Sequence, residues 1–282
     1  MTKGDIMGLL ACLIYLVLAV SVAVSLVAYS FFWFENSASF RLGKRPYSEL
    51  LKGFLSGILS LPIVIVCYPL AWFGKLQRPK TVSSSEPAII LTHGLYHNAS
   101  AWILFKRRLN KAGFSNIFLM DYGSFFTSFE NVMEKFELFV SEVRKAAPGQ
   151  PLVLIGHSLG GLVSRVYAEK ASEEEAPSAV ITLGAPHQGS KMTAFGPGLL
   201  ASGLVYRGPL FEELEGMARR VPCPAIALYS PVDPLVLPEE GLRARYGGWL
   251  HCETAPVSHV SMLFSASVSR QVIDQLKSIL NR

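Results

Sequence analysis

Residues 152–161 read LVLIGHSLGG, an apolar run followed by a turn rich in glycine. The run has the length of a buried strand, and residues 159–171 after it have the apolar spacing of a helix. The five-residue pattern GxSxG is common by chance, because Gly and Ser are frequent residues. Its place between a strand and a helix makes it specific, since a nucleophilic serine sits in such a turn. An ordinary glycine turn with an inert serine is the alternative.

Short apolar runs alternate with longer amphipathic segments over residues 88–282. We predict strands at 88–92, 117–121, 152–156, 179–184, 225–230 and 250–255. We predict helices at 99–112, 129–147, 159–171 and 267–280. This alternation favours an α/β fold with a mostly parallel sheet of about six strands flanked by helices.

The composition of the 282-residue chain does not fit an ordinary soluble domain. Hydrophobic residues make up 50%, charged residues 17%, and the mean hydropathy is +0.35, whereas soluble chains have about 25% charged residues. The four cysteines have no metal-ligand spacing, so we expect no metal site. The net charge of +5 arises in residues 1–80, with eight basic and three acidic residues; residues 81–282 carry eighteen of each. We therefore expect no nucleic-acid partner and assign the basic excess to the flanks of membrane segments.

Two uncharged apolar runs predict a membrane anchor in residues 1–80. The first, residues 6–34, has 29 residues, and the second, residues 53–74, has 22. About 20 apolar residues cross a bilayer, so we predict two transmembrane helices and a multi-pass protein of the cell or inner membrane. Gly53 and Gly57 form a GxxxG step that can pack against the first helix. A cleaved signal peptide, and a buried or interfacial second helix, are the alternatives.

The basic residues beside these runs do not decide the orientation in the membrane. Four lie between the runs and four on the other side: Arg41, Lys44, Arg45 and Lys52 against Lys3, Lys75, Arg78 and Lys80. Because the numbers are equal, the positive-inside rule favours neither orientation. Two spans would place the N-terminus and the large C-terminal region on the same side. Residues 81–87, with three serines in a row, are predicted to be a linker.

Ser158 is the candidate nucleophile, and it needs a base because a serine hydroxyl is weakly nucleophilic. With this type of turn the order along the chain is Ser, then Asp or Glu, then His, and three histidines follow Ser158. His187 precedes the strand-end acids, and His251 lies inside a predicted strand. His259 follows the last strand, at the carboxyl edge where parallel sheets form their sites. We therefore select His259 as the base, with a surface-loop histidine as the alternative.

Asp233 is the candidate acid that would orient the base. It follows the predicted strand 225–230 in a turn with proline on either side, at the same edge of the sheet. There it would hold the imidazole tautomer and stabilise the imidazolium. Glu239 and Glu240 are rivals a further turn away, and a purely structural Asx turn is the alternative.

A tetrahedral intermediate also needs hydrogen-bond donors for its oxyanion. One should be the backbone N–H of Leu159, directly after the nucleophile. The other should come from the loop after the first strand, where we select Leu95, because Gly94 lets the backbone turn its amide inward. His93 in the same loop is better explained as a brace than as a proton carrier. The turn itself is completed by Gly156, His157 and Gly160.

These stretches together resemble the α/β-hydrolase family, and within it the bacterial lipase branch. The resemblance covers residues 86–282 and rests on residues 89–95, 156–161, 182–189, 229–233 and 257–259. It implies a catalytic domain that hydrolyses carboxylic esters through an acyl-enzyme, without a cofactor, on a lipid or other apolar ester. Only a short linker precedes the first strand, so the antiparallel strands that open larger members are not expected. Some members hold calcium through an acid after the catalytic histidine; Val260 and Ser261 stand there, so no calcium site is expected.

Several alternatives stay open from the sequence. Residues 190–221 form either a small lid over Ser158 or a connection that covers the sheet. Cys223 and Cys252 form either a disulfide or two buried thiols, depending on the compartment. A membrane-anchored esterase or lipase is the favoured function. An acyltransferase with the same triad, a non-catalytic membrane scaffold and a secreted lipase with a cleaved leader are the alternatives.

Overall fold

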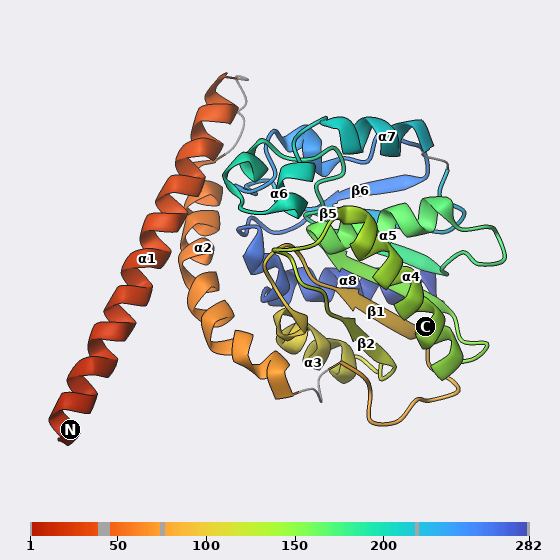
Figure 1. Ribbon diagram of the computed structural model, residues 1–282, viewed down its shortest axis with the longest axis horizontal. Coiled ribbons are helices and arrows are strands. Elements are labelled where there is room, and N and C mark those ends of the chain that lie inside the picture. The colour runs from red at the N-terminus through yellow and green to blue at the C-terminus, as the bar shows by residue number, and fades with distance from the viewer. Residues whose placement is uncertain (1, 39–45, 74–76, 218–219, 281–282) are drawn as a thin grey trace.

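The computed structural model describes residues 2–38, 46–73, 77–217 and 220–280. A six-stranded sheet lies at its centre, in the order β2-β1-β3-β4-β5-β6 (Figure 1). The strands are β1 (Ala88–Thr92), β2 (Ile117–Met120), β3 (Leu152–His157), β4 (Ala179–Leu183), β5 (Ala225–Tyr229) and β6 (Trp249–Glu253). Every neighbouring pair is parallel, so all the carboxyl ends lie at one edge. The predicted α/β sheet is confirmed.

Helices cover both faces of this sheet. One face packs against α4 (Phe129–Ala146), α5 (Leu159–Lys170), α6 (Leu199–Gly203) and α7 (Pro209–Met217), and the other against α3 (Ile103–Lys111) and α8 (Ala266–Ile279). Side chains alternate along a strand, so Leu154 joins the first core while Val153 and Ile155 join the second. A strand buried on both faces must be apolar throughout, which explains the run before the GxSxG turn. Short 3-10 segments are η2 (Tyr68–Phe73), η3 (Ala99–Trp102), η4 (Lys191–Phe195), η5 (Glu239–Leu242) and η6 (Val260–Leu263).

The N-terminal region forms a helical hairpin of α1 (Lys3–Ala38) and α2 (Tyr47–Cys67). Both helices are long and apolar enough to cross a membrane. The GxxxG step faces α1: a side chain at Gly53 would collide with the Tyr29 hydroxyl, and a Cβ at Gly57 would lie 3.0 Å from Ser25 Oγ. Of the basic residues beside the two apolar runs, Arg41, Lys44, Arg45 and Lys75 lie outside the described residues.

The hairpin lies along one side of the sheet domain, with α2 between α1 and the domain (Figure 1). Residues 3–20 of α1 are exposed, apart from the half-buried Val17. The second half of α1 has a buried stripe at helical spacing: Ser21, Ser25, Ala28, Phe32 and Asn36. α2 contacts η3 and η6 of the domain. The first half of α1 is therefore free of the domain, whereas α2 is packed onto it.

Candidate active site

Ser158 occupies the turn between β3 and α5 with a strained backbone. Its φ of 53° and ψ of −123° lie in a region that residues other than glycine rarely adopt. The turn is held by a 2.9 Å hydrogen bond from Ser158 N to Leu183 O. A side chain at Gly156 would collide with the backbone of Gly160, and one at Gly160 would collide with the carbonyl of Thr92. Glycine is therefore required at both positions, and the turn presents the half-buried serine at the carboxyl edge of the sheet.

Asp233 and His259 form a buried pair at the same edge. The structure brings Asp233 Oδ2 within 2.7 Å of His259 Nδ1, and both side chains are nearly inaccessible. The other carboxylate oxygen accepts hydrogen bonds from the backbone N–H groups of Leu235, at 2.9 Å, and Val236, at 3.1 Å. A carboxylate only accepts, so Nδ1 carries the proton and Nε2 is left as an acceptor.

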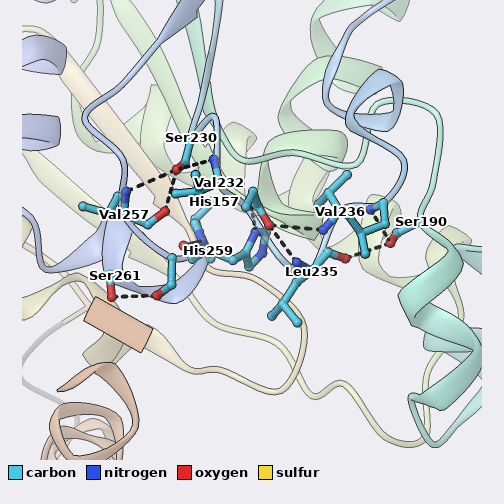
Figure 2. Close-up of polar contacts among 12 residues, drawn as sticks. His157, Ser190, Ser230, Val232, Leu235, Val236, Val257, His259 and Ser261 are labelled. Atoms are coloured by element: carbon cyan, nitrogen blue, oxygen red, sulfur yellow. Dashed lines mark hydrogen bonds and ion pairs between the residues drawn. The ribbon is translucent and has the colours of Figure 1, made fainter. Parts of the chain in front are cut away.

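The loops that carry this pair are tied to each other. Ser230 Oγ donates to Val257 O at 2.5 Å and accepts from Val257 N at 3.2 Å. Figure 2 shows His259 between this contact and the turn that carries Leu235 and Val236. The two loops follow the adjacent strands β5 and β6, so the sheet brings together residues that are 26 positions apart.

A cavity of about 450 Å³ lies at this edge, and both Ser158 and His259 line it. Its volume is within the range of small-molecule sites, about 300–1,000 Å³. Most of the wall is apolar, including Val24 of α1, Leu95, Met192, Phe195, Leu204 and Leu235. A larger depression of about 690 Å³ lies between α4 and α5 and is lined by charged groups such as Glu137 and Lys145. The smaller cavity is the candidate active site, because of these two it is the one lined by both the candidate nucleophile and the candidate base.

The two selected oxyanion donors lie beside the serine. Leu159 begins α5, where first-turn N–H groups lack helical acceptors, and Leu95 lines the cavity. Within the described parts of the chain, neither backbone N–H has a hydrogen-bond acceptor. A Cβ at Gly94 would lie 2.8 Å from the Cβ of Ser158. Glycine therefore allows the loop to approach the serine closely, and both amides stay candidates for the oxyanion hole.

Sequence comparison connects the chain to known hydrolases. A sequence model of the family described as "Serine aminopeptidase, S33" matches residues 83–215. A GPI inositol-deacylase from Candida albicans is 28% identical over 89 residues, which cover 29% of this chain and 23% of that protein. The chain thus aligns with less than a quarter of this relative's length.

Solved structures share the architecture at low sequence identity. The mature lipase BlEst2 of Bacillus licheniformis has a TM-score of 0.59 at 16% identity, over 72% of this chain and 96% of that chain. Lipase B of Aspergillus fumigatus has a TM-score of 0.59 at 14% identity, over 70% and 54%. Est1E of Butyrivibrio proteoclasticus has a TM-score of 0.55 at 16% identity, over 73% and 93%. The chain has the α/β-hydrolase fold.

Two of the rival bases are engaged away from the cavity of this hydrolase fold. His187 is buried, with Nε2 3.0 Å from Thr182 Oγ1 and its ring against Trp249. Burial lowers the pKa of His187 well below its usual value, and the nearby charge of Arg165 acts in the same direction. His251 accepts a hydrogen bond from the backbone N–H of residue 244 at 3.1 Å. Neither histidine lines the cavity that holds Ser158.

Three further histidines lie in the loop after β1 and at the end of β3. His93 braces the first loop, as expected: Nδ1 donates to Gly94 O at 2.8 Å, and Nε2 lies 3.0 Å from Asp121. His157 Nε2 donates to the backbone carbonyl of His259 at 3.0 Å. Burial lowers the pKa of His157 well below its usual value, and burial together with the neighbouring histidines lowers the pKa of His97 to about 3. His97 and His157 are thus neutral at physiological pH, and the hydrogen bond of His157 holds the loop that carries His259.

Gly184 borders the candidate acid and the candidate base, which the sequence did not reveal. It follows β4 with a φ of +57°, which favours glycine. A Cβ there would lie 3.1 Å from His259 Nδ1 and 3.2 Å from Asp233 Oδ2. Gly184 therefore leaves room for the hydrogen-bonded pair. The sequence feature that could have identified it is a glycine at the carboxyl end of the strand predicted at 179–184.

Parts of the segment 190–221 line the cavity, and other parts cover the sheet. η4 contributes Met192 and Phe195 to the cavity wall, whereas Leu200 and Leu214 of the following helices join the sheet core. Residues 218–219 lie outside the described residues. The cysteines at 223 and 252 are free thiols in the structure, and burial raises the pKa of Cys223 to about 11.

Proposed function

We propose that the protein is a membrane-anchored serine hydrolase that cleaves carboxylic esters of lipids or other apolar molecules. One observation carries the proposal: Ser158 on its strained turn and the base of the buried Asp233–His259 pair line a single apolar cavity. Activation of a serine needs a base within reach and a third group that orients the base. These three side chains supply those roles at the edge where open parallel sheets bind ligands.

The proposed reaction begins when Ser158 Oγ attacks the ester carbonyl carbon and His259 Nε2 takes the hydroxyl proton. Asp233 holds Nδ1–H and stabilises the imidazolium, and the N–H groups of Leu95 and Leu159 donate to the oxyanion. The intermediate collapses, the alcohol leaves with the proton from His259, and the acyl group stays on Ser158 as an ester. Water then attacks this ester with His259 again as base, which releases the carboxylic acid and regenerates the serine.

The cavity wall favours an apolar ester over a peptide N-terminus. Among the described residues that line the cavity there is no Asp or Glu to pair with an α-ammonium group. An unpaired ammonium group in an apolar site would cost several kcal/mol. The name of the Candida albicans relative states that it removes acyl groups from inositol, which agrees with cleavage of an acyl ester. We therefore place esters ahead of aminopeptidase substrates.

The hairpin supports the membrane anchor. Residues 3–20 of α1 are exposed and apolar in large part. A helix rises 1.5 Å per residue, so this half of α1 spans about 27 Å, close to the roughly 30 Å of a bilayer core. The cavity lies next to α1 through Val24, so ester substrates dissolved in the bilayer would meet the site from the hairpin side. Extraction of washed membranes with carbonate tests this proposal: an anchored protein stays in the pellet, and a released one contradicts the anchor.

The catalytic proposal is tested by hydrolysis of p-nitrophenyl esters, from acetate to palmitate, by the detergent-solubilised protein. Ser158→Ala should abolish the hydrolysis. Ser164→Ala is the matched control, because Ser164 is buried in the helix after Ser158 and its hydroxyl donates to Gly160 O within that helix. Leucine p-nitroanilide tests the aminopeptidase alternative. Absence of ester turnover by the folded wild type, or activity retained in Ser158→Ala, would contradict the proposal.

A further inference from the structure

The helical hairpin touches both loops that carry the Asp233–His259 pair. α2 packs against η6, which begins directly after His259. Tyr29 of α1 reaches the loop that precedes Asp233. A tether that only holds a domain at a membrane needs no such contacts. The hairpin is therefore placed to fix the positions of the catalytic loops.

Ser56 of α2 makes hydrogen bonds with residues that lie on either side of His259 in the sequence. The backbone N–H of Ser258 donates to Ser56 Oγ at 2.7 Å, and Ser261 Oγ donates to Ser56 O at 2.7 Å. Ser258 and Ser261 also share a hydroxyl hydrogen bond of 2.8 Å. Figure 2 shows Ser261 beside the orange ribbon of α2, with His259 close by. The positions immediately before and two residues after His259 are thus linked to one residue of the hairpin.

Tyr29 of α1 makes a hydrogen bond with the residue that precedes Asp233. Its hydroxyl donates to the carbonyl oxygen of Val232 at 3.0 Å, one residue before Asp233. Val232 is completely buried and packs with Phe32 of α1. A Cβ at Gly53 would lie 2.6 Å from a methyl group of Val232, so the glycine permits this approach of α2. The turn that carries the acid is therefore held by both helices.

We propose that Ser56 and Tyr29 are positioning residues for His259 and Asp233, and that the hairpin is a component of the catalytic centre. This inference rests on the proposed serine hydrolase function. The reason is geometric: His259 Nδ1 and Asp233 Oδ2 lie 2.7 Å apart, and misplacement of a catalytic group by about 1 Å can reduce a rate about 100-fold. Hydrogen-bonded supporting residues hold catalytic side chains within such tolerances.

The test compares two serines on the same helix. Ser56 and Ser60 each donate to a helix carbonyl three residues back, to Gly53 O at 2.7 Å and Gly57 O at 2.8 Å. Among the described residues, the Ser56 hydroxyl accepts a hydrogen bond from the loop that carries His259, and the Ser60 hydroxyl accepts none from it. Ser56→Ala should lower kcat for an ester substrate about tenfold to 100-fold, with KM within about twofold. Ser60→Ala should leave both constants within about twofold, and Ser56→Thr should restore most of the lost kcat because it keeps the acceptor.

Tyr29→Phe removes one hydroxyl and should lower kcat in the same way. A general loss of folding would instead lower the fraction of active protein for all variants alike, without the rescue by threonine. Unchanged kcat in both Ser56→Ala and Tyr29→Phe would overturn the inference. An equal loss in Ser60→Ala would overturn it as well, because the hydrogen bond of that hydroxyl in the described structure goes to Gly57 O of its own helix.

Amide hydrogen exchange on the full-length protein in detergent provides a readout that needs no substrate. Removal of the Ser56 hydroxyl leaves the N–H of Ser258 without its acceptor, so exchange in residues 254–264 should become faster than in Ser60→Ala. Unchanged exchange in this segment would overturn the positioning role. A wild type that hydrolyses no ester would refute the proposed function instead, and the exchange comparison would still decide whether the hairpin orders the loop.

Discussion

The hydrogen bond between Asp233 and His259 provides a sharp quantitative prediction. Asp233→Asn keeps the shape of the side chain, and the amide oxygen can still accept from the N–H groups of Leu235 and Val236. The amide NH₂ group then faces His259 Nδ1, where the carboxylate oxygen lies at 2.7 Å in the wild type. Two donors cannot share one hydrogen bond, so the imidazole must move its proton to Nε2. In that tautomer His259 cannot take the proton of Ser158.

The expected loss in kcat is about 10³-fold to 10⁴-fold, the size seen when a triad histidine is held in the wrong tautomer. This corresponds to about 4–5.5 kcal/mol of transition-state stabilisation. The free energy of unfolding should change by less than about 1.5 kcal/mol, because the charge-assisted bond to His259 becomes a neutral one, the desolvation cost of the buried carboxylate disappears, and the two bonds from Leu235 and Val236 are kept. The activation energy should therefore change far more than the stability.

The assay measures kcat for a p-nitrophenyl ester together with urea unfolding of the same preparation. Asp233→Asn should retain the unfolding midpoint of the wild type within a small shift and lose nearly all turnover. Glu239→Gln serves as the control, because this rival acid pairs with Arg243 at 3.2 Å and does not line the cavity. A kcat for Asp233→Asn within tenfold of the wild type would refute the assignment of the acid.

Three further predictions concern the stability of the domain. His97, His157 and His187 are neutral in the fold because burial lowers their pKa values. Their stabilisation is complete above the unfolded pKa of about 6.5 and is lost as the pH falls below it, so the free energy of unfolding measured with urea should fall by about 4 kcal/mol in total at pH 5.5. A flat profile between pH 7.5 and 5.5 would contradict this. Glu169→Gln breaks the ion pair with Arg165, whose two side chains are 5% and 2% exposed, and should lower the free energy of unfolding by about 3 kcal/mol. Glu142→Gln breaks a pair with Arg78 that is more than half exposed and should lower it by less than about 1 kcal/mol. Gly160→Ala places a methyl group into a backbone carbonyl at the end of β1, so soluble, folded protein should be lost. A wild-type melting temperature would show that the turn around Ser158 is not so tightly packed.

Much of the catalytic domain could be predicted because its strands are short apolar runs with clear ends. All six predicted strands begin within one residue of the observed ones, for example residues 225–230 against Ala225–Tyr229 for β5. The helix predicted at 267–280 is observed at Ala266–Ile279. The chain order Ser158, Asp233, His259 then placed three candidates at one sheet edge, where the structure brings the last two into contact.

The docking of the hairpin could not be predicted in the same way. Ser56 stands in an apolar run, where a serine has the same appearance as any small residue of a membrane helix. Its partner Ser258 is 202 residues away, and no local pattern connects two positions at that distance. Periodicity identifies an apolar face but does not say whether lipid or protein covers it. The role of Gly184 was hidden for a related reason, because its positive φ appears only in the folded chain.

The central claim is that Ser158 is an activated nucleophile, and a fluorophosphonate probe tests it without knowledge of the natural substrate. The probe forms a covalent bond with a serine that a neighbouring base activates. Peptide mapping by mass spectrometry should find one adduct per chain, on Ser158, absent from Ser158→Ala and formed far more slowly in His259→Gln. A folded wild-type protein that gains no adduct, or gains one on another serine, would contradict the proposed active site.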